Sequence, residues 1–200
     1  MTAAVDALRE GKPVVMPFDT VYGLAADAKQ EQAVRRLYEL KGRAETDPCA
    51  LVAHDVDYLL ECVPELSGHA AERARLLLPG PVTLILPNPA GRFRWLTGTN
   101  PGTIGVRVPA FAGPGADVLE RVGVVAATSA NHPGGRDPKR LDEVPRAIRD
   151  GAGALVDGGE LPGSPSTVID LTGPEPRILR EGALPAEEAL RRLGAAVRSG

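Results

Sequence analysis

The sequence predicts an α/β protein whose twisted mixed sheet carries helices on both faces. Short runs rich in Val, Leu, Ile and Ala alternate with longer segments in which apolar residues recur at helical spacing. Strands that are apolar throughout need cover on both sides, and helices provide that cover in α/β proteins. The last three predicted strands follow one another without a helix between them, which favours a mixed sheet over a fully parallel one.

Element boundaries in the first half of the chain are marked by glycines and capping residues. Gly11 ends a first amphipathic segment, and Gly42 follows a second one. Asp55 and Ser67 stand where helix N-caps are expected. The expected helices are Ala4–Arg9, Glu31–Lys41, Asp55–Cys62 and Ser67–Leu78, and the expected strands are Pro13–Pro17, Cys49–Ala53 and Val82–Leu86.

The second half opens with a loop, Asn88–Gly102, of a length at which loops are usually functional or mobile. Pro185 is suited to start a final helix, and the tail Val197–Gly200 is expected to fray. The expected strands here are Thr103–Val108, Val124–Thr128, Ala154–Val156, Ser166–Leu171 and Arg177–Leu179, and the expected helices are Ala116–Val122, Glu143–Asp150 and Pro185–Leu193.

Length and composition predict one soluble, cytoplasmic domain over residues 1–200. A net charge of −3 argues against a domain that holds nucleic acid by charge alone. Cys49 and Cys62 form no disulfide framework, and reduced thiols fit a reducing compartment. We expect no membrane span, because no apolar run approaches the roughly 20 residues that a spanning helix needs. The first twelve residues also lack the continuous apolar core of a signal peptide.

The stretch PFDTVYGL, Pro17–Leu24, directly follows the first predicted strand. It combines an acid, two hydroxyls and a glycine with Val21 and Tyr22, which are poor turn formers and good strand formers. The stretch is therefore either a twisted continuation of the strand or a binding loop.

Hydroxyl, amide and cationic side chains recur at the ends of the predicted strands. Thr103 and Arg107 lie four positions apart, so they share one face of one strand. Any one of these residues taken alone is better explained as a cap, a turn residue or a surface cation. Their recurrence favours a site for an anionic ligand with several hydrogen-bonding groups, such as a phosphate or a carboxylate. The set comprises Asp19, Thr20, Tyr22, Lys41, Arg43, Thr103, Arg107, Ser129, Asn131, Ser166, Thr167 and Arg180.

Other familiar catalytic patterns are absent from the sequence. There is no P-loop, no nucleophile elbow and no dinucleotide fingerprint. The three histidines and two cysteines lack ligand spacing, so we expect no protein metal site. The segment Arg92–Trp95 combines basic and aromatic residues, and either stacks on RNA or is a loop anchored by Trp95.

Seven segments in order resemble the motifs of the YrdC-like family. They cover the chain from about Pro17 to Ala183, and their number and order make the resemblance specific. The segments are PFDTVYGL, KGR (Lys41–Arg43), LPGPVTLIL (Leu78–Leu86), TIGVRVP (Thr103–Pro109), ATSAN (Ala127–Asn131), PSTVID (Pro165–Asp170) and ILREGA (Ile178–Ala183).

The resemblance implies an enzyme of the short, single-domain branch of that family, with a deep and largely positive central cavity. Such enzymes combine L-threonine, bicarbonate or CO2, and ATP into threonylcarbamoyl-adenylate and pyrophosphate. A downstream transferase then passes the threonylcarbamoyl group to tRNA. Mg2+ is expected as well, bound mainly through the nucleotide phosphates, and a weak contact with tRNA is a further expectation.

The resemblance also implies roles for ten residues. The catalytic set around the nucleotide phosphates is Lys41, Arg43, Ser129 and Asn131. Thr103 and Arg180 are expected on the ATP side, together with Arg43, Ser129 and Asn131. Threonine is expected to contact Thr20, Arg107, Ser166 and the backbone of Ala127.

Four residues depart from the family pattern. Phe18 replaces a threonine and Leu78 a tryptophan, while Asp47 and Asp137 place acids near the expected nucleotide site. Two alternatives stay open: a carbamoyl-adenylate-forming relative with another acceptor, and a non-catalytic RNA-binding module that uses Arg92–Trp95 and Arg136–Arg140. The loop Ser129–Arg140 has the glycines and proline of a lid.

Overall fold

The computed structural model describes residues 2–194, and the predicted frayed tail Val197–Gly200 lies outside the described residues. The helices are α1 (Thr2–Arg9), α2 (Glu31–Lys41), α3 (Val56–Cys62), α4 (Gly68–Leu77), α5 (Pro114–Val122), α6 (Arg146–Gly151) and α7 (Ala186–Arg192). The strands are β1 (Val14–Pro17), β2 (Tyr22–Asp27), β3 (Ala50–Ala53), β4 (Val82–Pro87), β5 (Thr103–Arg107), β6 (Val124–Ser129), β7 (Ala154–Leu155), β8 (Thr167–Asp170) and β9 (Arg177–Arg180).

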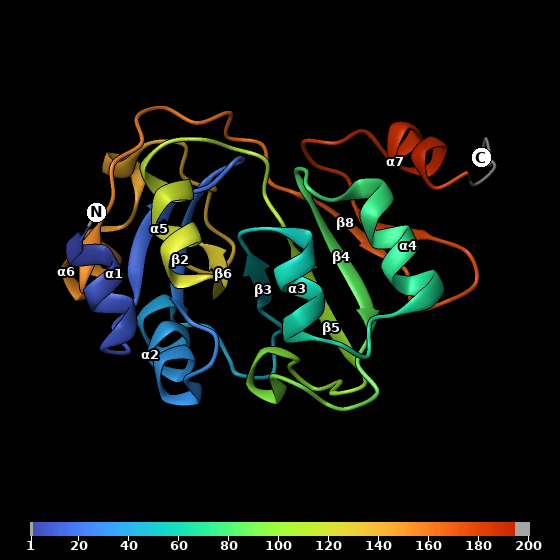
Figure 1. Cartoon of the computed structure of the whole chain (residues 1–200). Helices are drawn as coiled ribbons and strands as arrows, with labels where there is room; N and C mark the ends of the chain where they lie inside the picture. The colour runs from blue at the N-terminus through green and yellow to red at the C-terminus, as the bar shows by residue number, and fades with distance from the viewer. Residues whose placement is uncertain (1, 195–200) are drawn as a thin grey trace.

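The described strands form one twisted mixed sheet in the order β7-β1-β2-β6-β3-β5-β4-β8-β9 (Figure 1). Three neighbouring pairs are parallel, namely β1 with β7, β3 with β5, and β4 with β8. The remaining five pairs are antiparallel. The mixed sheet predicted from the order of elements is therefore confirmed.

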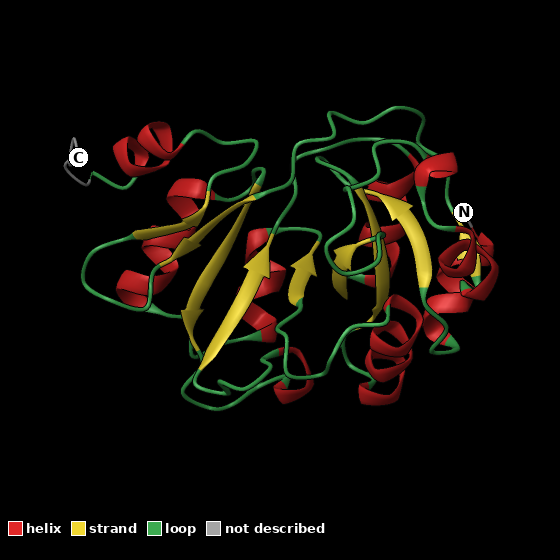
Figure 2. Cartoon of the chain, turned by 180° about the vertical axis from the view of Figure 1, so that it is seen from behind, coloured by secondary structure: helices red, strands yellow, loops and turns green. Residues whose placement is uncertain are grey.

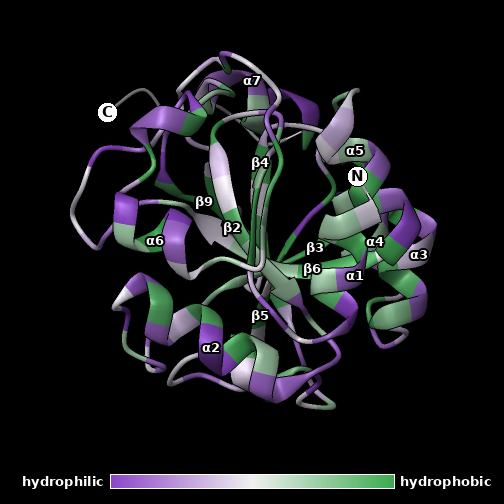
Figure 3. Ribbon diagram, turned by 90° about the vertical axis from the view of Figure 1, so that its left-hand side faces the viewer, coloured by the Kyte–Doolittle hydropathy of each residue, from purple (hydrophilic) through white to green (hydrophobic). Residues whose placement is uncertain are grey.

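Helices cover the two faces of the sheet unequally. One face packs against α2, α3 and α4 in a core that runs from β1 to β8. The other face packs against α1 and α5, in a core whose strand residues come from β1, β2, β3 and β6. Figure 2 views the sheet from behind, where β5, β4 and β8 lie in front of the helices on their far side. In Figure 3 the strands in the middle of the molecule are mostly green, because the sheet is built largely from hydrophobic residues that pack against the helices.

Buried and half-buried residues alternate along β4 and β5, whose second face is not covered by a helix. In β5, Ile104 and Val106 are buried, whereas Thr103, Gly105 and Arg107 are half-buried. β4 has the same period, with Thr83 and Ile85 among its half-buried residues. Since successive side chains of a strand point to opposite faces, one set fills the helix-covered core and the other set remains available for a site.

The stretch PFDTVYGL turns the chain back on itself and does not continue the first strand. Phe18–Val21 make a tight link, with Phe18 N donating to Val21 O at 3.3 Å, and the chain returns as the antiparallel strand β2. Local sequence does not identify this strand, because its alanines and glycine have weak strand propensity. β2 lies between β1 and β6, where ladder bonds on both edges override that propensity.

Smaller differences from the predicted elements occur at segment ends. The helix predicted from Glu143 begins at Arg146, after a short 3-10 helix over Leu141–Glu143. Another 3-10 helix, Arg94–Leu96, lies within the long loop. The Asp55 cap is confirmed, because its side chain accepts from Tyr58 N at 2.7 Å. Among the described residues, no helix has the length and apolarity to cross a membrane.

A strap over residues 157–165 connects β7, at one edge of the sheet, with β8, which lies next to the opposite edge strand β9 (orange, Figure 1). It is fastened to the link before β2, since Gly163 N donates to Thr20 O at 2.9 Å. The Tyr22 hydroxyl also accepts from Gly158 N and lies 3.0 Å from Asp157 Oδ1 and 2.9 Å from Gly159 O, to either of which it can donate. The strap therefore holds the PFDTVYGL segment in place beside the uncovered half of the sheet.

Candidate active site

A pocket of about 380 Å³ lies against the part of the sheet that no helix covers. Side chains from β4, β5, β6, β8 and β9 reach it, together with the link before β2 and the loop before β5. Eight of the ten site residues predicted from the sequence line this pocket: Thr20, Arg43, Thr103, Arg107, Ala127, Ser129, Ser166 and Arg180. The expected depth of the cavity stays a prediction.

Arg107 and the PFDTVYGL segment form one end of the pocket. An Arg107 Nη donates to Asp19 Oδ1 at 2.6 Å and to Thr20 Oγ1 at 3.3 Å. Both members of the ion pair are largely buried, with side-chain exposures of 12% for Arg107 and 5% for Asp19. Burial lowers the pKa of the Arg107 guanidinium, and the Asp19 charge opposes that effect. Because arginine does not lose its proton in proteins, the site holds a fixed cation that can bind a carboxylate.

Asp19 supports that cation rather than entering the pocket itself. Burial raises the pKa of its carboxyl, while the Arg107 charge acts in the opposite direction. A 2.6 Å contact with a permanent cation keeps the carboxylate ionised at neutral pH. The sequence analysis counted Asp19 among the polar residues at strand ends, and the structure shows that it orients Arg107.

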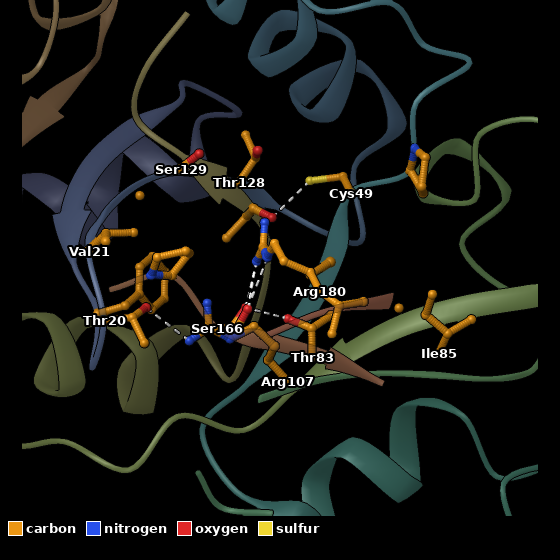
Figure 4. Close-up of a pocket in the computed structure, with 18 of the residues that line it drawn as sticks. Thr20, Val21, Cys49, Thr83, Ile85, Arg107, Thr128, Ser129, Ser166 and Arg180 are labelled. Atoms are coloured by element: carbon orange, nitrogen blue, oxygen red, sulfur yellow. Dashed lines mark hydrogen bonds between the residues drawn. The ribbon is translucent and has the colours of Figure 1, made fainter. Parts of the chain in front are cut away.

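A second cation, Arg180, reaches the pocket from β9. Its Nε and one Nη donate to Ser166 O at 3.1 and 2.7 Å, and the same Nη lies 3.2 Å from Ser166 Oγ. Ser166 Oγ is also 2.8 Å from Thr83 Oγ1 on β4 (Figure 4). Thr83 was not predicted as a site residue, although the period of two along β4 places it on the same face as Ile85. These contacts link three strands into one polar wall.

Arg43 brings a third cation to the pocket from the segment after α2. It donates to Thr128 Oγ1 at 3.0 Å and to Pro48 O at 2.9 Å, which fixes its guanidinium against β6. Asp47 lies outside the pocket lining, with its Oδ2 at 3.6 Å from Arg43 Nε and its side chain 56% exposed. The acid noted as a departure from the family pattern therefore points outward, whereas Asp137 does line the pocket.

Lys41 and Asn131 are the two predicted residues that do not line the pocket. The Lys41 ammonium is buried and donates to Ser129 O at 2.5 Å, and to Asn131 O and Asn131 Oδ1 at 2.9 Å each. Ser129 Oγ donates to the same Asn131 Oδ1 at 2.6 Å. The three residues thus form one network, in which the lysine holds the turn that carries Ser129. Direct contact of Lys41 with a phosphate stays a prediction.

Lys41 should make stability depend on pH in the alkaline range. Burial, followed by the charge of Arg43, lowers the pKa of Lys41 from its ordinary value of 10.5 to about 8. Between these two pH values the unfolded chain binds more protons than the folded chain, so the free energy of unfolding rises with pH. We expect wild type minus Lys41→Met to rise by up to about 1.4 kcal/mol per pH unit between pH 8 and 10 in urea unfolding. A difference that is flat with pH would contradict the assigned burial of the charge.

Cys49 lines the pocket, whereas the sequence indicated only that its thiol is reduced. Its Sγ donates to Ala127 O at 3.0 Å, which fixes the backbone of β6 where threonine is expected to bind (Figure 4). Burial raises the pKa of this thiol to about 11, so it is protonated at neutral pH. A protonated thiol that already donates a hydrogen bond is unsuited to nucleophilic catalysis.

The long loop before β5 is anchored by Trp95 and contributes polar side chains to the pocket. Trp95 Nε1 donates to Ala28 O at 2.9 Å, which supports the anchoring role over base stacking. Arg92 makes a two-point ion pair with Glu65. Thr97, Thr99 and Asn100 of the same loop line the pocket. Their signal in the sequence was only the density of small polar residues in this loop.

No group of three or more His, Cys, Asp or Glu side chains within residues 2–194 could hold a metal ion. Asp137 is the only acidic side chain among the described residues of the pocket lining. It accepts from Asn131 Nδ2 at 3.2 Å. The pocket therefore suits a metal ion that arrives with its ligands on a phosphate chain, rather than one held by the protein alone.

Comparison with known proteins decides the family. The family model Sua5_yciO_yrdC, described as Telomere recombination, matches residues 6–182. The chain belongs to the Sua5/YciO/YrdC family. The match spans every residue of the pocket lining and all seven motifs except Ala183, the last residue of the seventh.

Three relatives within the Sua5/YciO/YrdC family place the chain more closely. It is 38% identical to a threonylcarbamoyl-AMP synthase of Pyrococcus abyssi over 194 residues, which cover 96% of this chain and 56% of that protein. It is 33% identical to a putative threonylcarbamoyl-AMP synthase of Mycobacterium tuberculosis, covering 97% of this chain and 89% of that protein. The crystal structure of P. abyssi Sua5 complexed with L-threonine superposes with a TM-score of 0.84 at 37% identity, covering 96% and 56% of the two chains. The chain thus spans little more than half the length of the P. abyssi protein.

Proposed function

We propose that the protein is an L-threonylcarbamoyladenylate synthase that uses L-threonine, bicarbonate or CO2, and ATP, and releases pyrophosphate. The observation that carries this proposal is one pocket with three arginines from separate elements, in a chain whose relatives are named threonylcarbamoyl-AMP synthases. Three fixed cations suit a reaction between anionic substrates. The arginines are Arg43, Arg107 and Arg180.

The amino-acid end of the proposed site is formed by Arg107, Thr20, Ser166 and the backbone of Ala127. Arg107 is held by Asp19 and keeps other N–H groups for the threonine carboxylate. The hydroxyls of Thr20 and Ser166 line the same space and can bind the polar groups of the amino acid. The threonine bound to the P. abyssi relative supports this choice of ligand.

The nucleotide end is assigned to Arg43, Ser129, Thr103 and Arg180, with Asn131 and Lys41 behind Ser129. The cations would offset the charge of the triphosphate, and Lys41 would hold the Ser129–Asn131 turn against it. Mg2+ would bind mainly through the phosphates, with Asp137 as the nearby carboxylate, and would supply further charge neutralisation.

The proposed reaction requires the protein to position the substrates and to neutralise their charge, and it requires no protein nucleophile. A carbamate formed on the threonine nitrogen attacks the α-phosphate of ATP, and pyrophosphate leaves. Both reactants are anions, so fixed cations lower the cost of their approach. Holding two bound reactants in line can lower such a barrier by up to roughly 7–11 kcal/mol. The pocket meets these requirements, because it is rich in cations and hydroxyls and its single thiol is protonated.

The wider role follows from the product. We propose that a downstream transferase uses the adenylate to modify tRNA in the cytoplasm, with at most a weak contact between this protein and tRNA itself. Residues 1–200 would act as a single domain in this task. The loop Ser129–Arg140 would act as a lid over the bound nucleotide. The two alternatives are another acyl acceptor and a non-catalytic RNA-binding module, and the experiment below distinguishes both from the synthase.

The test measures pyrophosphate release from ATP with Mg2+, while threonine and bicarbonate are each present or omitted. Release that requires both, and that collapses in Arg43→Ala, is the expected result. Asp47→Ala serves as the matched control, since it removes the exposed partner of Arg43 and leaves the cation. Release that ignores threonine would favour another acceptor. Salt-sensitive tRNA binding without any turnover would favour the RNA-binding module.

A further inference from the structure

A second cavity of about 190 Å³ lies next to the pocket. Its lining is mainly apolar and includes Phe111, Pro114, Leu161 and Pro162, and Asp19 is the one charged residue among its described lining residues. Of the residues that the structure describes, Phe18 alone lines both this cavity and the pocket. The side chain of Phe18 is therefore a shared wall between the two spaces.

Packing on both sides holds the Phe18 ring in that position. Phe18 is only 3% exposed. Its ring lies so close to Gly23 that a Cβ built there would come within 2.5 Å of Phe18 Cε2. On the other side, its centroid is 6.1 Å from that of Phe111, with the two rings tilted by 38°. Because the Phe18 ring packs against both the backbone of Gly23 and the ring of Phe111, it has little room to move.

The Phe18 wall stands at the amino-acid end of the pocket. Phe18 directly precedes Asp19, which holds Arg107, and Thr20, whose hydroxyl lies 3.3 Å from the same arginine. An amino acid whose carboxylate binds Arg107 would thus present its side chain near this wall. Phe18 is also the residue at which the chain departs from the threonine of the family signature.

We propose that Phe18 determines the size of the amino-acid side chain that the pocket accepts. The inference rests on the proposed function, because it assigns the amino acid to the Arg107 end. The ring offers an apolar surface to the methyl group of threonine and blocks side chains that are longer by one or more carbons. Shortening it would join the pocket to the apolar cavity of about 190 Å³ and give longer side chains a place to go.

The test compares three amino acids of increasing size in the pyrophosphate-release assay. These are L-threonine, 3-hydroxynorvaline with one carbon more, and 3-hydroxyleucine with two more. In Phe18→Ala, the kcat/KM ratio of 3-hydroxyleucine to threonine should rise by about tenfold or more over wild type. Phe18→Leu keeps more of the core filled and should raise the ratio for 3-hydroxynorvaline in the same direction. It therefore keeps the test informative if the alanine variant does not fold.

Leu161→Ala is the matched control, because it removes a side chain that lines the second cavity without lining the pocket and leaves both rings of the Phe18–Phe111 pair in place. It should lose stability, measured by thermal unfolding, and keep the wild-type order of substrates. A folded Phe18→Leu or Phe18→Ala with unchanged selectivity would overturn the proposal, as would an equal change in Leu161→Ala.

The proposed function and the role of Phe18 can fail separately in this experiment. Wild-type turnover of threonine tests the function alone. If wild type releases no pyrophosphate, calorimetric titration of the three amino acids into wild type and both Phe18 variants still measures the size preference of the site. Binding that becomes more permissive in the variants would then support the role of Phe18. Unchanged preference, or no binding of any of the three, would refute it.

Discussion

Arg107→Ala is expected to abolish useful binding of L-threonine. The guanidinium is the buried cation at the amino-acid end, and its partner Asp19 is nearly fully buried as well. Truncating one member of a buried, hydrogen-bonded charge pair costs about 2–5 kcal/mol of binding, so the Kd should rise by roughly 30-fold or more. Isothermal titration with threonine measures this directly. Urea unfolding should also report a loss of about 3–5 kcal/mol, because Asp19 is left as an uncompensated charge.

Arg107→Lys separates the two effects. A lysine keeps the positive charge beside Asp19, so much of the lost stability should return. It lacks the planar fork that binds a carboxylate at two points, so the weak binding of threonine should persist. Wild-type affinity in Arg107→Ala would remove Arg107 from the amino-acid site altogether.

Lys41→Met is expected to have the second largest effect, although Lys41 does not line the pocket. Methionine fills a similar volume but donates no hydrogen bond to the two backbone carbonyls and the Asn131 amide oxygen that the ammonium now serves. Each buried acceptor left without a donor costs about 1–3 kcal/mol. The turn that carries Ser129 would shift, and a displacement near 1 Å can slow the reaction by on the order of 100-fold.

The measurement for Lys41→Met is pyrophosphate release at saturating substrates, together with urea unfolding. Lys29→Met is the matched control, since Lys29 is an exposed lysine that contacts the Tyr58 hydroxyl outside the pocket. The control should keep wild-type turnover. If Lys41→Met were as active as the control, the network of Lys41, Ser129 and Asn131 would have no part in catalysis.

Most elements could be predicted because their patterns are local. Helix α2 was placed at its observed bounds by apolar residues at helical spacing and a glycine stop at Gly42, which adopts a positive φ of 68°. Strand β2 could not be identified from its own residues, because its stability comes from ladder bonds to its neighbours in the sheet. One neighbour is the preceding strand β1, and the other is β6, which lies far along the chain. Local propensity carries no information about such pairings.

Site residues were predicted by motif, but their orientation was not. Lys41 looks in the sequence like any cation at the end of a helix, and only the packing of the 129–131 turn against α2 shows that its ammonium is buried. The same holds for Asp47, which turns outward, and Asp137, which lines the pocket. For Lys41 the orientation depends on contacts with Ser129 and Asn131, 88 and 90 positions further along the chain.

The most direct measurement of the central claim is to identify the product. Wild-type protein is incubated with ATP, Mg2+, L-threonine and 13C-bicarbonate, and the reaction is analysed by mass spectrometry. The account predicts threonylcarbamoyl-adenylate that is heavier by one mass unit than the product formed from unlabelled bicarbonate, in step with pyrophosphate release. An adenylate that contains no threonine, or pyrophosphate release without incorporation of the labelled carbon, would contradict it.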